Sequence, residues 1–359
     1  MSQKSTEPII GGLPPPLGVI PNFEDPYSIA PVLHGITILL LVLSTFSTII
    51  RMYTRFQIMK DHGWEDYIMF VAWLGFLAYC AVGYPALRYG AGVHQWNVPA
   101  TSVIEWAKWG AIAEVVYPPL IALTKLSICI QFLHIFVPER GIKYWGVQVF
   151  IWINMLYFVA CFFVSLFQCL PREKIWNPTV RGTCLNYKPY ILATGIFNCV
   201  SDALMLIFPV FSVWDLHMSF ARKLGVSAIF LVGTLAVISS IMRIVYSSIN
   251  NQSHDSTYHL TQVGMCTVGE ICAGIVIGNL ILFPRFFKTC TPKLSQLFSS
   301  YRASTKTGSN RPSDLTISKS WQKIPGKAMP GQRSEEVLTA ESIELSHSIS
   351  GISLSSREP

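Results

Sequence analysis

The stretch GVQVFIWINMLYFVACFFVSLFQ, residues 146–168, carries no charged side chain. An α-helix rises about 1.5 Å per residue, so about 20 apolar residues reach across the hydrocarbon core of a bilayer. A surface helix of a soluble protein would show a polar face along its whole length, and this stretch has no such continuous face. It therefore predicts a helix that spans a membrane.

Similar apolar runs recur along the chain. The predicted spans are residues 32–50, 66–87, 108–133, 146–168, 189–213, 225–248 and 261–283. The composition agrees, because 51% of the residues are hydrophobic and 13% are charged, whereas a soluble domain carries about 25% charged residues. The predicted fold class is an all-α integral membrane protein, a seven-transmembrane helix bundle.

The chain divides into three predicted parts. Residues 1–31 are rich in Pro and Gly and form an extracellular segment, and residues 32–284 hold the seven spans. Residues 285–359 contain many Ser, Thr, Lys and Arg residues, and from residue 302 on Trp321 is their only aromatic residue. Because such a composition buries too little apolar surface to fold alone, we expect a disordered tail.

The distribution of basic residues predicts the orientation. Lys and Arg are more frequent beside the span ends on the side of the C-terminus than on the opposite side. Since cytoplasmic loops carry the excess of basic residues, we expect the N-terminus outside, the tail in the cytoplasm, and the plasma membrane as location.

Two features of the outer loops follow from this topology. Cys169 and Cys184 bracket the longest outer loop, where an oxidising compartment allows a disulfide to persist. Asn251 begins an Asn-Gln-Ser sequon in a loop predicted to face outward, which makes it a candidate for N-glycosylation. Its nearness to the membrane argues against modification.

Five charged residues lie inside the predicted spans, away from their ends. They are Glu114, Lys125, Asp202, Arg243 and Glu270. A charge at the centre of a bilayer costs at least about 2.5 to 3.5 kcal/mol, so such groups face the bundle interior and find partners. From their depths along the spans we expect Lys125 to pair with Asp202. Arg243 is then shared by, or contested between, Glu114 and Glu270.

One carboxylate is left over in this group of charges. Such an acid is either protonated or available to a cationic or hydrogen-bonding ligand, and its position predicts an outward-opening cavity lined by the third, sixth and seventh spans. Asn198, four residues before Asp202, extends the polar site along the same helix face. The alternative is a purely structural polar network that binds no ligand.

Several ordered motifs resemble one known family. They are RMYTRFQIMKDHGWEDY (51–67), YGAGVHQW (89–96), LTKLSICIQFLHIF (123–136), CLPREKIWNPTVRGTC (169–184), FNCVSDALMLIFPVFSVWDL (197–216) and KLGVSAIFLVGTLAVISSIMRI (223–244). Together they look like the fungal rhodopsin-like seven-transmembrane family, receptor-like proteins of filamentous fungi with some members in secondary-metabolite gene clusters. The resemblance implies a seven-helix membrane fold and leaves the biochemical activity mostly unassigned.

The residues limit the function classes further. The seventh span contains no lysine that could form a Schiff base with retinal, so we expect no cofactor. The sequence also shows no metal-binding motif, His cluster or nucleophile elbow, so we expect no bound metal and no enzyme activity. No nucleic acid is expected as a partner. The favoured function is a receptor-like protein in the lipid bilayer that senses an extracellular small molecule or surface cue and signals to a cytoplasmic partner through its inner loops and tail. The alternative is a transporter or an accessory membrane component of a secondary-metabolite pathway.

Overall fold

The computed structural model describes residues 10–136, 141–177, 179–213 and 220–289. Within these ranges, seven helices are long and apolar enough to cross a membrane, which confirms the predicted all-α bundle. Their bounds are α1 Ala30–Tyr53, α2 Trp64–Arg88, α3 Ala100–Phe136, α4 Ile142–Leu166, α5 Tyr187–Val213, α6 Phe220–Gln252 and α7 Ser256–Leu280. The predicted tail lies, from residue 290 on, outside the described residues.

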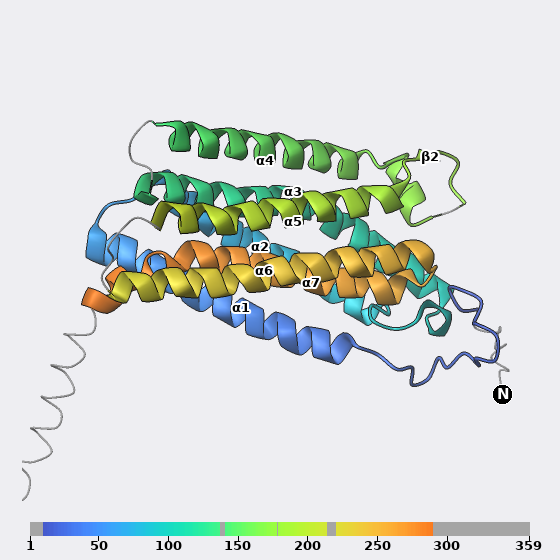
Figure 1. Cartoon of the computed structure of the whole chain (residues 1–359). Helices are drawn as coiled ribbons and strands as arrows, with labels where there is room; N and C mark the ends of the chain where they lie inside the picture. The colour runs from blue at the N-terminus through green and yellow to red at the C-terminus, as the bar shows by residue number, and fades with distance from the viewer. Residues whose placement is uncertain (1–9, 137–140, 178, 214–219, 290–359) are drawn as a thin grey trace, which may run out of the picture. The chain divides into compact units, whose positions relative to one another are not determined.

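The helices lie side by side, with α4 and α1 on opposite flanks and the others between them (Figure 1). The centre of the bundle is formed by α3 and α7, because 61% of the most apolar stretch of each is buried, against 17% for α2. Phe76, Ile121, Ile271 and Ile275 are almost completely buried in the core between these helices. The most buried core residues therefore lie on the two central helices and, with Phe76, on α2 beside them.

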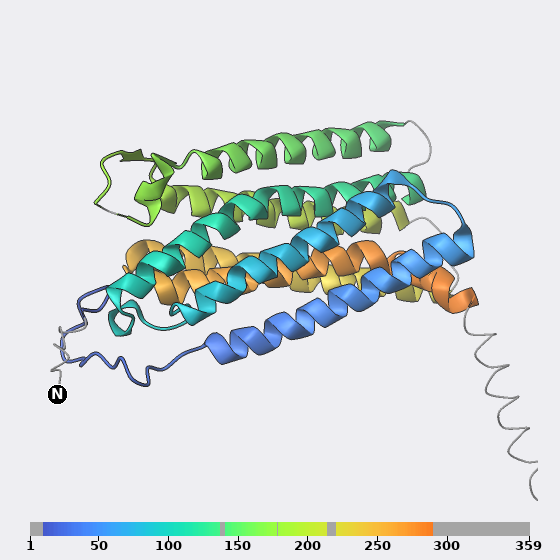
Figure 2. The ribbon, with the colours of Figure 1, turned by 180° about the vertical axis from the view of Figure 1, so that it is seen from behind.

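The helix α3 is longer than predicted. It begins at Ala100, whereas the apolar run begins at residue 108, because Glu105 and Lys108 interrupt the hydropathy without ending the helix. These two side chains stand one turn apart on the exposed surface, with Lys108 Nζ 3.8 Å from Glu105 Oε2. Pro118 and Pro119 lie within α3, and its ribbon changes direction partway along (Figure 2).

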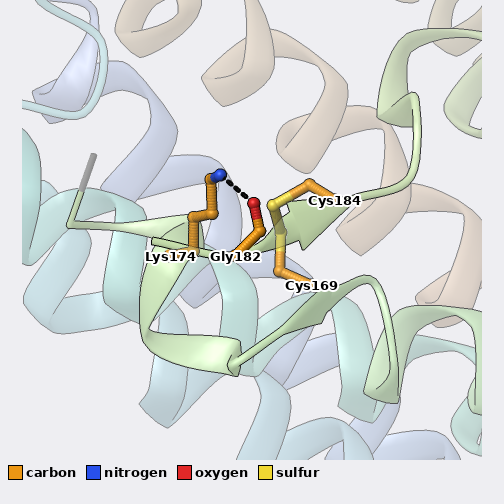
Figure 3. The surroundings of a disulfide bond; sticks show 4 residues. All are labelled: Cys169, Lys174, Gly182 and Cys184. Atoms are coloured by element: carbon orange, nitrogen blue, oxygen red, sulfur yellow. Dashed lines mark hydrogen bonds between the residues drawn. A yellow bond between two sulfur atoms is a disulfide. The ribbon is translucent and has the colours of Figure 1, made fainter. Parts of the chain in front are cut away.

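The loop between α4 and α5 carries the predicted disulfide. The strands β1, Cys169–Leu170, and β2, Thr183–Cys184, pair antiparallel, and Cys169 and Cys184 are joined by a disulfide, as the sequence predicted (Figure 3). The short helix η3, Arg172–Ile175, lies between the strands, and Lys174 Nζ donates a hydrogen bond to the carbonyl of Gly182. We call this end of the bundle the disulfide end.

The segment before α1 lies across the disulfide end. Gly11 forms a bridge with Pro99, and Ser28 forms one with Val93. The loop between α2 and α3, which contains the helix η2 (Gln95–Asn97), also contacts the start of α7, where Asp255 Oδ2 lies 2.5 Å from His94 Nδ1. Several chain segments therefore hold the disulfide end together in addition to the disulfide.

Two regions expected to be loops are helical. After α1, the π-helix η1, Thr54–Met59, continues the chain, so Arg51 and Arg55 are helical and buried rather than solvated loop charges. At the disulfide end α6 runs on to Gln252, so Asn251 lies in its last turn and not in a loop. In both places the apolar run ended earlier than the helix, because polar residues that have partners inside the protein do not end a helix.

Candidate functional site

The first ion pair of the interior joins α3 to α5. Lys125 Nζ lies 2.8 Å from Asp202 Oδ1, and the two side chains are 3% and 12% exposed. This is the contact expected from the depth of the two residues in the sequence. Lys125 Nζ also donates to the carbonyl of Asn198 at 3.4 Å and lies 5.5 Å from the ring centre of Phe158.

The second oxygen of Asp202 connects this pair to α6. Asp202 Oδ2 accepts hydrogen bonds from Asn198 Nδ2 at 2.9 Å and from Ser240 Oγ at 2.7 Å. Asn198 is completely buried, so its side chain is committed to this network. The sequence predicted that Asn198 and Asp202 share a helix face, whereas the hydrogen bond from Ser240 to Asp202 was not predicted.

The second ion pair joins α6 to α7. Arg243 Nη1 lies 3.2 Å from Glu270 Oε2. Tyr117 of α3 stands between them: its hydroxyl donates to Glu270 Oε1 at 3.2 Å and accepts a hydrogen bond from Arg243 Nη1. Ser240 Oγ lies 3.4 Å from Glu270 Oε2, so Ser240 connects both ion pairs into a single polar network across α3, α5, α6 and α7. We call this the central network.

Glu114 does not join the central network, which corrects one alternative of the sequence analysis. Among the described residues, the side chain of Glu114 forms no hydrogen bond and no ion pair. Tyr117, one turn further along α3, occupies the place beside Arg243 instead. The central network contains two cations and two carboxylates, so Glu114 is the carboxylate left over.

Glu114 lines a large cavity in the disulfide-end half of the bundle. The cavity has a volume of about 700 Å³. It is lined by the disulfide-end halves of α1, α2, α3, α4, α5 and α7, and from α6 by Arg243. From the positions of the charged residues we expected walls from the third, sixth and seventh spans only. The structure adds walls from α1, α2, α4 and α5, which the charged residues did not indicate. Tyr79, Tyr117 and Tyr190 add phenol groups to walls that are mainly apolar.

The central network lies between this cavity and a smaller one. Arg243 and Tyr117 line the large cavity, whereas Lys125, Asp202 and Glu270 line a space of about 40 Å³ on the other side. Such a space has room for about one water molecule. The large cavity therefore ends at the central network.

A second buried cluster, which the sequence analysis did not identify, lies at the end opposite the disulfide. Arg51 Nη2 is 2.7 Å from Asp66 Oδ1, and Arg51 Nη1 donates to Gln131 Oε1 at 3.0 Å and to the carbonyl of Gly278 at 2.7 Å. Arg55 contacts Glu65 and Asp66, at 3.1 Å each. The cluster joins α1, α2, α3 and α7. In the sequence, the acidic pair Glu65–Asp66 at the start of the second apolar run was the feature that could have revealed this cluster.

The described residues contain no group of three or more His, Cys, Asp or Glu side chains placed to hold a metal ion. The site is therefore a cavity with one unpaired carboxylate, bordered by a buried ion-pair network. Its chemistry suits binding: apolar walls take up an apolar body, and the few polar groups orient it.

The chain is similar in sequence to one protein family and to several known proteins. A profile of the fungal rhodopsin domain matches residues 50–300. The chain is 36% identical over 264 residues to a SAT4 family membrane protein of Emericella nidulans, covering 73% of this chain but only 64% of that relative. It is 26% identical over 285 residues to fugralins biosynthesis cluster protein 2 of Gibberella zeae, covering 77% and 70% of the two chains. It is also 23% identical over 260 residues to polyenoic acids biosynthesis gene cluster protein Ba17b of Metarhizium anisopliae, covering 67% and 69%. No solved structure matches.

Proposed function

Because this chain belongs to the fungal rhodopsin domain family of membrane proteins, we propose that it is a receptor-like protein that binds a small molecule in the cavity of its disulfide-end half. The observation that carries the proposal is the cavity itself. Its volume of about 700 Å³ falls within the range of about 300 to 1,000 Å³ that small-molecule sites occupy. Its mainly apolar walls and its one unpaired carboxylate match the usual composition of such sites.

The contact between the cavity and the central network supports a signalling function. Arg243 and Tyr117 line the cavity and also hold Glu270 of α7. A ligand that contacts either side chain changes the free energy of the arrangement that joins α3, α6 and α7. Since a ligand shifts an equilibrium only by its different affinity for two states, this shared boundary is where a ligand would act on helix packing.

Filling the cavity tests the proposal. Gly110 lines the cavity, and a Cβ atom added there would meet no atom within 4 Å. Gly110→Phe therefore adds a bulky side chain to the cavity wall from a Cβ position that has room. Gly146 of α4 is equally open but does not line the cavity, so Gly146→Phe is the matched control.

The measurement is thermal unfolding of the purified protein in detergent, across a panel of small metabolites and lipids. We expect at least one compound to stabilise the parent and Gly146→Phe and to lose that effect in Gly110→Phe. Equal stabilisation of Gly110→Phe would place binding elsewhere. A panel without any stabilising compound would contradict a binding function for the cavity.

A carrier function is the second candidate. It is favoured by the names of two relatives, which are proteins of the fugralins and polyenoic acids biosynthesis clusters. A carrier has to open the central network to pass a molecule from the large cavity to the other side of the bundle. Net movement of a cavity-binding compound into protein-containing vesicles would support the carrier, whereas binding without movement supports the receptor.

We place the protein in the plasma membrane with the disulfide end outside, and we assign it no enzyme activity. The disulfide supports this orientation, because such bonds persist in oxidising compartments. The buried cluster of Arg51, Arg55, Glu65 and Asp66 then lies near the cytoplasmic side, where a signalling partner would bind. An epitope at the N-terminus should be labelled by antibody in intact cells, and labelling only after permeabilisation would reverse the orientation.

A further inference from the structure

We propose that the ligand of the cavity is an apolar molecule that carries a protonated amine, and that Glu114 is its counter-ion. This inference rests on the proposed function, because it names the chemical class that the same cavity selects. The geometry behind it is the position of an unpaired carboxylate on the wall of a cavity of about 700 Å³. It predicts a preference for cations over neutral or anionic molecules of the same shape.

The balance of charges singles out Glu114. In the central network Lys125 and Arg243 are matched by Asp202 and Glu270 through ion pairs of 2.8 and 3.2 Å. Neither cation is free to neutralise Glu114. An unpaired carboxylate in mainly apolar surroundings is costly, so a ligand that brings a positive charge gains more there than a neutral one.

Arg172 of η3 brings a positive charge to the part of α3 that carries Glu114. Its guanidinium does not pair with the carboxylate. Instead, Arg172 Nη2 donates to the carbonyl of Ala111 at 3.2 Å, one turn before Glu114 on α3. The Glu114 carboxylate therefore lines the cavity without an ion-pair partner among the described residues.

The prolines of α3 leave two backbone carbonyls of this helix without their usual donors. Pro118 and Pro119 have no N–H, so the carbonyls of Glu114 and Val115 lack the donors that they would have in a regular helix. An ammonium group has three N–H donors and no acceptor. The Glu114 carboxylate on the cavity wall is likewise only an acceptor, so it is complementary to an amine and repels an anionic carboxylate.

The remaining walls determine the body of the ligand. Leu41, Leu77, Ala107 and Val268 are among the apolar lining residues, and they favour an aliphatic or aromatic group over a sugar. Apolar walls also exclude water, which strengthens the attraction between two opposite charges. The predicted class is therefore a hydrophobic amine.

Three indole compounds of similar shape test the inference. Tryptamine carries an ammonium group, tryptophol a neutral hydroxyl and indole-3-propionate a carboxylate. Stabilisation of the purified protein against thermal unfolding is titrated with each of them near pH 7. We expect tryptamine to act on the parent at a concentration at least about tenfold lower than tryptophol, a factor that corresponds to about 1.4 kcal/mol. Indole-3-propionate should be weakest.

Two variants assign the preference to a residue. Glu114→Gln keeps the shape of the side chain and should remove the preference for tryptamine over tryptophol. Arg172→Gln is the control with the opposite charge: it removes a neighbouring cation, so tryptamine should bind equally or more tightly. If Glu114→Gln does not fold, the ratio of tryptamine to tryptophol on the parent still decides whether the ligand is an amine, and Arg172→Gln still tests whether its charge lies beside Glu114.

The outcomes separate this inference from the proposed function. Equal action of tryptamine and tryptophol on the parent, with both effects lost in Gly110→Phe, overturns the amine and leaves the cavity as a binding site. A tryptamine preference that persists in Glu114→Gln overturns the role of Glu114. Absence of stabilisation by all three compounds at millimolar concentration overturns the amine inference. The metabolite and lipid panel with Gly110→Phe then decides separately whether the cavity binds any molecule.

Discussion

Neutralising Asp202 should destabilise the bundle strongly. Asp202→Asn keeps the shape of the side chain but removes the charge that lies 2.8 Å from Lys125 Nζ. Lys125 is 3% exposed, and its other hydrogen bond, to the carbonyl of Asn198, is long at 3.4 Å. Removing one partner of a buried pair costs about 3 to 5 kcal/mol, because the other charge stays buried without compensation. We expect a loss of this size in the free energy of unfolding.

The reciprocal change should cost less. In Lys125→Met, Asp202 keeps the hydrogen bonds from Asn198 Nδ2 at 2.9 Å and Ser240 Oγ at 2.7 Å. The two changes should also be strongly non-additive, because the second removes the partner that the first left unpaired. The double variant should therefore be more stable than the sum of the single losses indicates.

Unfolding of the purified protein by SDS in mixed micelles measures these free energies. The matched control is Glu105→Gln, which breaks the exposed pair with Lys108 at 3.8 Å and should cost no more than about 1 kcal/mol. A loss for Asp202→Asn no larger than that of the control, or strictly additive effects in the double variant, would refute the assigned energetics of the pair.

Three further predictions concern other parts of the bundle. Cys184→Ser should lower the free energy of unfolding by about 3 kcal/mol, because the disulfide closes a loop with a sequence separation of 15. Cys169→Ser should have an equal effect, and the double variant should lose no more in the SDS titration. Asp66→Asn should cost about 3 to 5 kcal/mol in the same titration, since it leaves the fully buried Arg51 without its carboxylate, and a loss below about 1 kcal/mol would contradict this. A glycosidase should leave the apparent mass of the parent unchanged, because Asn251 lies in the last turn of α6 and not in a loop, and a mass that falls in the parent but not in Asn251→Gln would contradict this.

The number and type of the main elements were predictable from local sequence. A bilayer requires a continuous run of apolar residues wherever a helix crosses it, so each span is visible without knowledge of the others. The ends of the helices were less predictable. Glu105 and Lys108 hid the first turns of α3, and Arg51 and Arg55 were interpreted as loop charges although α1 and η1 continue through them. Hydropathy measures only whether a residue prefers lipid to water. Glu105 and Lys108 are helical on the exposed surface, and Arg51 and Arg55 are helical with buried partners, so their polarity does not mark the end of a helix.

The interior site was predictable in part. Lys125 and Asp202 had to find opposite charges at similar depth, and depth follows from counting residues along each span. Ser240 was not predicted, because a serine hydroxyl in an apolar helix usually bonds a carbonyl of its own helix, and Tyr117 was not predicted because it carries no charge that needs a partner at the same depth. Their contacts depend on the rotation of α3 and α6 about their own axes, which decides which side chains face α7. The depth of a residue along its span does not give this rotation.

The sequence by itself determined the membrane as solvent, seven apolar helices, five buried charges in their interior and two cysteines placed for a bridge. These properties depend on local composition and on spacing along each span. Only the tertiary structure decided that Arg243 contacts Tyr117 and Glu270, that Glu114 has no partner among the residues that the structure describes, and that six other helices join Arg243 around a cavity. The reason is physical: a partner is chosen by the distance between side chains on different helices, and that distance is set by the packing of the whole bundle.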